Sequence, residues 1–257
     1  MRIISLCPSN TEALAYIGLT EQLVGTDNYS DWPETILQLP KLGSDLEVDM
    51  AAVAELKPDL VVASLTVPGM ERNVEALRRL GLPHIVLNPS SLTDIGENLL
   101  TIGEAADCLP QAKAAYERYR AVLEGYREKA AACSWEKVPN VYWEWWPKPL
   151  FTPGGANWLT EISSLAGGVN AFADVPSASV RTVWSDVVER DPDVICLAWT
   201  GIRKQLINPE VVRRRPDSSR IRAVRSDRIH VMDERLCCRP SPRLLEGLEL
   251  LAELMRS

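Results

Sequence analysis

Residues 110–133 read Pro-Gln-Ala-Lys-Ala-Ala-Tyr-Glu-Arg-Tyr-Arg-Ala-Val-Leu-Glu-Gly-Tyr-Arg-Glu-Lys-Ala-Ala-Ala-Cys. Apolar side chains recur at positions i, i+4, i+7 and i+11, at Ala115, Tyr119, Val122 and Tyr126, while charged residues occupy the other faces. This spacing predicts one amphipathic helix. A helix of this length spans roughly 35 Å, about the width of a small domain. We therefore interpret the segment as a helix that joins two lobes.

The sequences on either side of this helix resemble each other. Residues 53–65 and 187–199 each contain the end of a helix, a Pro-Asp break and a continuous apolar run. Such a run is typical of a parallel strand that is buried on both faces. The matching residues lie 134 positions apart: Val53 and Val187, Glu55 and Glu189, Pro58 and Pro192, and Asp59 and Asp193.

A second similarity supports the duplication, because Ser9-Asn10-Thr11-Glu12 and residues 157–161 each open a helix after an apolar strand. Strands and helices alternate throughout both halves, which predicts parallel sheets flanked by helices. The expected fold is α/β, with two Rossmann-like lobes of parallel sheets joined by one long helix. The expected parts are an N-terminal lobe at 1–108, the joining helix at 109–134 and a C-terminal lobe at 135–257.

Composition excludes several classes of protein. The chain of 257 residues has a net charge of −7, which disfavours nucleic acid as a partner. No apolar run approaches the ~20 residues of a membrane span. The six cysteines lack CxxC spacing and are expected to be reduced thiols. Because no export signal precedes the first strand, we expect a cytoplasmic protein. A periplasmic or cell-surface protein is the alternative if a signal has been trimmed.

Aromatic residues gather where strands are expected to end. Trp143, Trp145 and Trp146 are nearly consecutive at the end of one expected strand. Phe151 lies in the stretch that follows that strand, and Trp199 ends the expected strand at 193–199. In the first half, residues 29–33 read Tyr-Ser-Asp-Trp-Pro, also after a strand. Because ligands of parallel α/β sheets bind at the carboxyl ends of the strands, we expect the two sets to face a cleft between the lobes. Packing of these rings in the core is the alternative.

Signals for other chemistry are weak. Only His84 and His230 exist, and each lies in an apolar strand, so no metal site is expected. The vicinal pair Cys237-Cys238 alone makes a poor metal site. No Gly-x-Ser-x-Gly elbow, GxGxxG or Walker loop is present. Loop acids such as Asp27, Asp31 and Glu144 could do acid/base work. The arginines between residues 213 and 228 are interpreted as a solvated surface.

Several motifs together resemble the cobalamin-binding (vitamin B12) substrate-binding proteins of ABC importers. They are Ser5-Leu6-Cys7-Pro8-Ser9-Asn10-Thr11-Glu12, Val24-Gly25 with Tyr29-Ser30-Asp31-Trp32-Pro33, Lys57-Pro58-Asp59-Leu60, Pro149-Leu150-Phe151-Thr152-Pro153-Gly154 and Ser241-Pro242-Arg243. The resemblance covers nearly the whole chain, in order. The family belongs to the helical-backbone class of periplasmic binding proteins, which also binds siderophores and haem.

This resemblance implies a non-catalytic protein that holds a corrinoid, cobalamin or a precursor, through aromatic contacts. Tyr29 matches a ligand-contacting tyrosine of the family, and Phe151 matches an aromatic residue of the second lobe. The family has other cleft tryptophans, which this chain does not reproduce after Gly43 or after Ala63. Trp143, Trp145 and Trp146 could compensate for them. The expected ligand contacts are Asn10, Tyr29, Trp32, Trp143, Trp145, Trp146, Phe151 and Trp199.

The resemblance also implies an ABC permease as partner, which the family contacts through one glutamate on each lobe. Here those positions hold Ala51 and Ser185. Together with the expected location, this suggests a protein that handles a corrinoid inside the cell. Three alternatives remain open: a haem or ferric-siderophore binder of the same fold, an enzyme acting on a corrinoid, and a structural interaction module.

Overall fold

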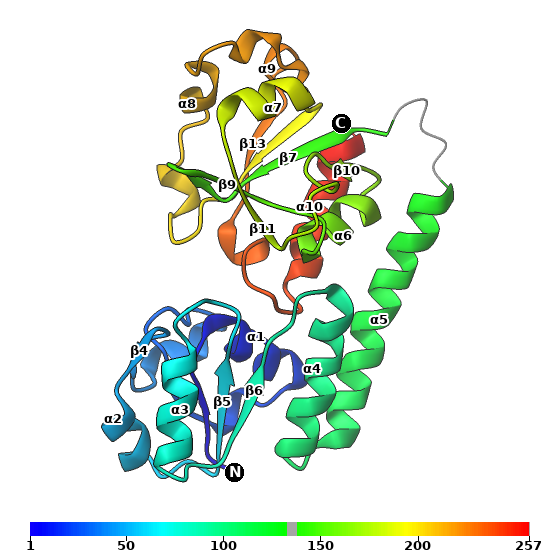
Figure 1. Ribbon diagram of the computed structural model, residues 1–257. Helices are drawn as coiled ribbons and strands as arrows, with labels where there is room; N and C mark the ends of the chain where they lie inside the picture. Colours follow the sequence, from blue (N-terminus) through cyan, green and yellow to red (C-terminus); the bar gives the residue numbers. More distant parts are fainter. Residues whose placement is uncertain (133–137, 257) are drawn as a thin grey trace. The chain divides into compact units, whose positions relative to one another are not determined.

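The computed structural model describes residues 1–132 and 138–256. The chain divides into unit 1, Met1–Ala121, and unit 2, Val122–Ser257, with the division inside the long helix α5, Leu109–Ala132 (Figure 1). Each unit contains a four-stranded parallel sheet with helices on both faces. The predicted α/β fold with two parallel sheets and one long helix is therefore confirmed. The predicted boundaries at 108/109 and 134/135 stay a prediction.

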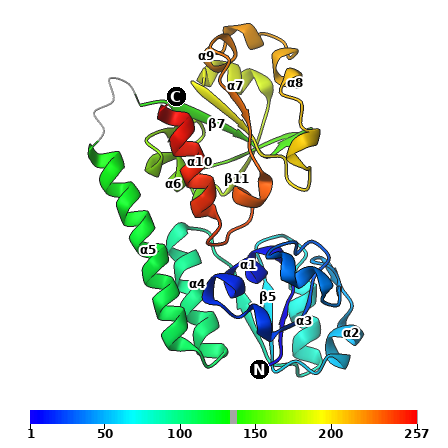
Figure 2. The same ribbon diagram turned by 180° about the vertical axis from the view of Figure 1, so that it is seen from behind.

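The sheet of unit 1 has the strand order β2-β1-β5-β6, and all its pairs are parallel. Its strands are β1 (Ile3–Ser5), β2 (Leu23–Thr26), β5 (Leu60–Ser64) and β6 (His84–Leu87). Helices α1 (Pro8–Ile17) and α4 (Leu92–Ala105) cover one face, and α2 (Met50–Glu55) and α3 (Glu71–Arg79) cover the other (Figures 1 and 2). Ile4 and Val61 of the sheet pack on the second face against Val53 and Leu77. A short hairpin, β3 (Gly43–Ser44) and β4 (Glu47–Val48), precedes α2.

The main sheet of unit 2 has the order β10-β7-β12-β13, again with parallel pairs. Its strands are β7 (Asn140–Glu144), β10 (Val169–Asn170), β12 (Val194–Leu197) and β13 (Ile229–Val231). Helices α6 (Trp158–Leu165) and α10 (Leu244–Arg256) lie on one face, and α7 (Trp184–Arg190), α8 (Glu210–Arg213) and α9 (Arg222–Arg225) lie on the other. Tyr142 of β7 packs toward α7 against Val187, whereas Trp143 faces α6. Short 3-10 helices occupy Thr20–Gln22, Glu34–Gln38, Lys204–Leu206, Ser218–Arg220 and Glu234–Leu236.

The duplication extends to individual hydrogen bonds. In unit 1, Arg2 N donates to Asp59 Oδ2 at 2.6 Å and Asp59 N donates to Arg2 O at 2.8 Å. In unit 2, Asn140 N donates to Asp193 Oδ2 at 2.9 Å and Asp193 N donates to Asn140 O at 2.8 Å. Each Pro-Asp pair thus fixes the start of one strand beside the first strand of its sheet. The repeated sequence therefore produces the same contact twice.

Helix α5 has the amphipathic pattern that its sequence predicts, with one departure. Ala112, Ala115, Tyr119 and Leu123 are buried, whereas Val122 is 40% exposed. The Tyr119 hydroxyl donates to Leu92 O at 3.0 Å and so joins α5 to the start of α4. Cys133, the last residue of the predicted helix, lies outside the described residues.

One further element differs from the expectation of parallel sheets. Unit 2 contains a small antiparallel sheet, β11-β9-β8, formed by β8 (Trp146–Pro147), β9 (Leu150–Pro153) and β11 (Ser179–Thr182). Helix α8 and the 3-10 turn Ser218–Arg220 stay separate because Pro216, which lacks an N–H, falls between them. Within the described residues, no helix combines the length and apolar composition that a membrane span requires.

Candidate functional site

In unit 1, the loop after β2 presents Tyr29 on a fixed backbone. The carboxylate of Asp27 is buried and accepts hydrogen bonds from Tyr29 N at 2.7 Å and Ser30 N at 3.1 Å, and also from the Ser30 hydroxyl. Asn28 N donates to Gly43 O at 2.8 Å, which joins the loop to β3. Burial raises the pKa of Asp27, an effect that these hydrogen bonds oppose. The Tyr29 side chain is 55% exposed and available for contact.

The other two predicted contacts of unit 1 differ from Tyr29. Trp32 is partly buried and precedes a cis peptide bond to Pro33. Asn10 is 3% exposed, and its Nδ2 donates to the carbonyl oxygens of Val62 and Ala63 at 3.1 and 3.0 Å. Its side chain therefore ties α1 to β5 and offers almost no surface to a ligand in this structure.

In unit 2, main-chain bonds bring four predicted aromatic residues together at the carboxyl ends of β7 and β12. Trp145 N donates to Phe151 O at 2.8 Å, and Thr200 N donates to Trp145 O at 3.1 Å. Trp146 and Phe151 are register partners in β8 and β9. Trp199 follows β12, whose pairing with β7 ends at Leu197 and Glu144. This is the point where the strand order reverses, which is the usual ligand position in open α/β sheets.

The rings at this edge differ in exposure and bonding. Trp146 is 39% exposed, and its Nε1 donates to Lys148 O at 3.0 Å. Phe151 and Trp199 are partly buried. Trp145 lies against Trp158, with ring centroids 6.1 Å apart and an interplanar angle of 37°. The Trp145 Nε1 atom is buried and has no hydrogen-bond partner within the described part of the chain.

Trp143 is not at this edge. It is fully buried, and its Nε1 donates to Ser163 Oγ of α6 at 2.9 Å. Along β7, Trp143 lies on the face covered by α6, and Tyr142 lies on the opposite face, toward α7. The structure thus gives Trp143 a packing position instead of the predicted ligand contact.

Sequence reasoning missed a buried polar cluster behind the aromatic edge. Glu144, the last residue of β7, is 0% exposed, and its carboxylate accepts hydrogen bonds from Tyr142, Trp199 and Arg215. Burial and the neighbouring Glu144 raise the pKa of Tyr142 well above its ordinary value, so its hydroxyl remains a donor. Since Arg215 is 71 positions from Glu144, no local pattern indicates their pairing.

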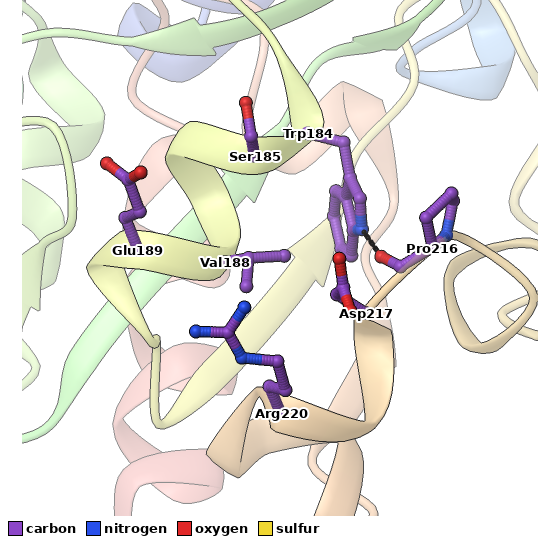
Figure 3. A pocket seen from close by; sticks show the side chains of 7 residues that line it. All are labelled: Trp184, Ser185, Val188, Glu189, Pro216, Asp217 and Arg220. Atoms are coloured by element: carbon purple, nitrogen blue, oxygen red, sulfur yellow. Dashed lines mark hydrogen bonds between the residues drawn. The ribbon is translucent and has the colours of Figure 1, made fainter.

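Ser185, one of the two positions implied for permease contact, lines a surface pocket of about 280 Å³ (Figure 3). The pocket is lined by Trp184, Ser185, Val188, Glu189, Pro216, Asp217 and Arg220. Trp184 Nε1 donates to Pro216 O at 2.8 Å and closes one side of it. Ala51 and Ser185 are both exposed and are the second residues of α2 and α7, so they occupy equivalent places in the two units.

The described thiols and acids do not form a metal centre. Cys7, Cys108, Cys196, Cys237 and Cys238 are free thiols. Burial raises the pKa of Cys7 to about 11 and that of Cys196 to about 12, which makes both poor nucleophiles. Among the described residues, no three His, Cys, Asp or Glu side chains are grouped so that they could hold a metal ion.

Comparisons with known proteins agree with this architecture. The family model described as "Periplasmic binding protein" matches residues 3–236. The chain is 30% identical over 257 residues to YvrC of Bacillus subtilis, an uncharacterized ABC transporter substrate-binding lipoprotein, covering 98% of this chain and 79% of that protein. It is also 30% identical over 199 residues to a vitamin B12-binding protein of Yersinia pestis, covering 77% of this chain and 70% of that one.

Solved structures show the same fold. The periplasmic vitamin B12-binding protein BtuF of Vibrio cholerae matches with a TM-score of 0.81 and 26% identity, over 99% of this chain and 96% of that one. The periplasmic heme-binding protein RhuT of Roseiflexus matches with a TM-score of 0.85 and 22% identity, over 99% and 97%. At that identity, RhuT is evidence for the fold alone.

The comparisons confirm two expectations and overturn one. The resemblance to importer binding proteins and the non-catalytic role are confirmed, because the matching family and the relatives are binding proteins. The prediction of a cytoplasmic protein is wrong, because the relatives are described as a lipoprotein or as periplasmic. That prediction rested only on the apparent lack of an export signal, and the suggested role inside the cell fails with it.

Proposed function

We propose that this chain, which belongs to the periplasmic binding protein family, binds a corrinoid such as cobalamin and delivers it to an ABC importer. One observation carries the choice of ligand. The Yersinia pestis relative described as vitamin B12-binding is 30% identical over 77% of this chain, whereas a possible iron-binding protein of Staphylococcus epidermidis is 25% identical and the heme-binding RhuT and IsdE are 22% and 19% identical. The fold does not distinguish these ligands, so sequence identity supports the corrinoid.

The exposed aromatic side chains support a large ring-shaped ligand. Tyr29 in unit 1 and Trp146 in unit 2 each stand on a backbone fixed by hydrogen bonds. Phe151 is the register partner of Trp146, and Trp199 precedes Thr200, whose N donates to Trp145 O. Aromatic residues on rigid elements bind ring systems at low entropic cost. That both units contact one ligand stays part of the proposal.

Absorbance titration of the purified protein with cyanocobalamin and, separately, with haemin tests the ligand. We expect a saturable one-to-one change in the cobalamin spectrum, confirmed by calorimetry, and no specific change in the haem Soret band. A saturable Soret shift without cobalamin binding would assign the protein to haem, which is the second candidate because of the fold it shares with RhuT.

For the permease partner, we propose that Glu47 and Glu189 replace the glutamates absent at Ala51 and Ser185. Among the nearby acids, Asp49 caps α2 by accepting from Ala51 N and Ala52 N at 3.0 Å, and Asp186 accepts from Thr182 at 2.9 Å. Glu47 and Glu189 are exposed, and Glu189 lines the pocket beside Ser185.

The partner is tested by measuring binding to an ABC permease reconstituted in nanodiscs. The double variant Glu47→Ala/Glu189→Ala should bind the permease more weakly than the wild-type chain. The matched variant Glu21→Ala/Glu246→Ala removes the same charge elsewhere and should bind as the wild type does. Equal loss in both double variants would contradict specific contacts at Glu47 and Glu189.

A further inference from the structure

The Glu144 carboxylate is the centre of a buried hydrogen-bond cluster. It accepts from Trp199 Nε1 at 3.1 Å and from Tyr142 Oη at 3.1 Å. Arg215 binds both of its oxygens, with Nη1 2.6 Å from Oε2 and Nη2 2.8 Å from Oε1. All four contacts converge on a residue that is 0% exposed.

Stability alone does not account for such a cluster. Removing two charges from water costs several kcal/mol per ion, and apolar replacements of a buried pair are often as stable as the pair itself. An ion pair, unlike an apolar contact, is directional, because two parallel N–H···O bonds fix the planes of the guanidinium and the carboxylate. The cluster therefore acts on geometry.

The geometry that it fixes is at the ligand-facing edge. Trp199 follows β12 where β12 lies beside the end of β7, and Ala198 N donates to Glu144 O at 3.0 Å. One part of the Trp199 ring packs against the core cluster that contains Tyr142, and its N–H is held by Glu144. These two contacts restrict both side-chain torsions of Trp199, which as a residue is partly exposed.

Arg215 connects this arrangement to a second tryptophan. Its guanidinium carbon lies 4.6 Å from the centroid of the Trp184 ring, a cation–π distance. Trp184 in turn lines the pocket beside Ser185 (Figure 3). The orientation of Arg215 is therefore set from both sides, which keeps its fork in register with Glu144.

We propose that Glu144 and Arg215 are positioning residues that hold the Trp199 indole in the orientation in which it contacts the ligand. The effect on affinity rests on the proposed function, whereas the effect on the ring does not. A ring that is already fixed loses little conformational freedom on binding, so releasing it weakens binding even though the aromatic side chain is still present.

The test removes the ion pair and the Tyr142 hydroxyl together, so that no buried charge is left unpaired and only the Trp199 indole N–H loses its acceptor. In the triple variant Tyr142→Phe/Glu144→Leu/Arg215→Met, apolar side chains of similar size replace all three. Thermal unfolding is measured first, and a midpoint near that of the wild type shows that the variant folds. Calorimetry with cyanocobalamin should then give affinity about tenfold weaker, the loss expected for freeing one large side chain. Wild-type affinity in a folded triple variant would overturn the proposal.

A double-mutant cycle that combines the triple variant with Trp199→Ala separates positioning of Trp199 from a general structural effect. If the cluster acts through Trp199, this substitution costs less affinity in the triple variant than in the wild-type background. Equal costs in the two backgrounds would overturn the proposal. If the triple variant does not fold, the double variant Glu144→Leu/Arg215→Met takes its place in the cycle, because it also removes the ion pair and the acceptor of the Trp199 N–H.

Indole N–H spectra of ¹⁵N-tryptophan-labelled protein test the proposal without a ligand, with the Trp199 signal identified by its loss in Trp199→Phe. In the triple variant, the Trp199 signal should shift and exchange faster with solvent, while the Trp143 signal stays in place because its partner is Ser163. An unchanged Trp199 signal overturns the positioning role. Failure of the wild type to bind cobalamin refutes the proposed function alone.

Discussion

Gly103 offers a stringent test of how closely helices α4 and α5 approach each other. A Cβ atom added at Gly103 would lie 2.2 Å from the Cβ of Ala112, whereas ordinary contacts of this kind begin at 3.4 Å. Ala112 has no flexible end that could turn away. In Gly103→Ala the two helices must therefore separate locally by about 1.2 Å, the difference between these distances. Overpacking of this kind costs about 1–3 kcal/mol.

Helix propensity opposes this cost, because alanine is better than glycine in a helix by about 1 kcal/mol. Since the displacement involves rigid backbone, we place the packing cost near its upper end and expect Gly103→Ala to lower the free energy of unfolding by about 2 kcal/mol. Gly125→Ala is the matched control, because an added Cβ there meets nothing within 4 Å. It should raise the free energy of unfolding by about 0.5–1 kcal/mol.

Urea unfolding followed by far-ultraviolet circular dichroism measures both variants, and unchanged m-values show that the unfolded states are comparable. The opposite signs of the two effects matter more than either size. If Gly103→Ala were as stable as Gly125→Ala, helix propensity alone would explain both, and the close contact between Gly103 and Ala112 would be refuted.

Three other predictions concern ligand contact, pH and thiol reactivity. Tyr29→Ala and Phe151→Ala should each weaken cobalamin binding by about 1–3 kcal/mol in calorimetry, as lost aromatic contacts do, whereas the exposed Leu37→Ala should leave it unchanged; unchanged affinity in both aromatic variants would show that the site lies elsewhere. Burial and a neighbouring arginine lower the pKa of His230, so the unfolded chain binds a proton more readily, and stability should fall as pH drops below about 6.5. The free energy of unfolding, measured with urea, should be lower at pH 5.5 than at pH 6.5 in the wild type. In His230→Leu this difference between the two pH values should disappear. Burial also raises the pKa of the five described thiols. The variant Cys133→Ser retains only these five thiols, so the folded variant should react slowly with a disulfide reagent at pH 8. Fast labelling would contradict the burial of these thiols.

The features that could be predicted from sequence depend on local signals. The Pro-Asp pairs predict where a helix ends and a buried strand begins, and Asp59 and Asp193 make the same contacts in their units. Lys57 and Asp191, also 134 positions apart, both adopt the left-handed conformation that ends a helix, with φ of 45° and 43°. Such features recur because each is determined by a few consecutive residues.

The features that could not be predicted depend on distant residues. Alternation along β7 puts Tyr142 and Trp143 on opposite faces of the sheet, but only the neighbouring helix α6, through Ser163, determines that Trp143 is in the core. Asn10 was predicted from its motif, yet its side chain is used by the carbonyl groups of β5. The pairing of Glu144 with Arg215 likewise has no local signal. A sequence pattern can place a side chain on a face, but the fold determines what covers that face.

The two units use a buried carboxylate in related but different ways. In unit 1, Asp27 accepts from the main chain of Tyr29 and Ser30, so it fixes the loop, and Tyr29 itself is 55% exposed. In unit 2, Glu144 accepts directly from the indole of Trp199 and fixes the ring itself. Because a side chain that is already fixed has less conformational freedom to lose, ordering Tyr29 costs more entropy than ordering Trp199.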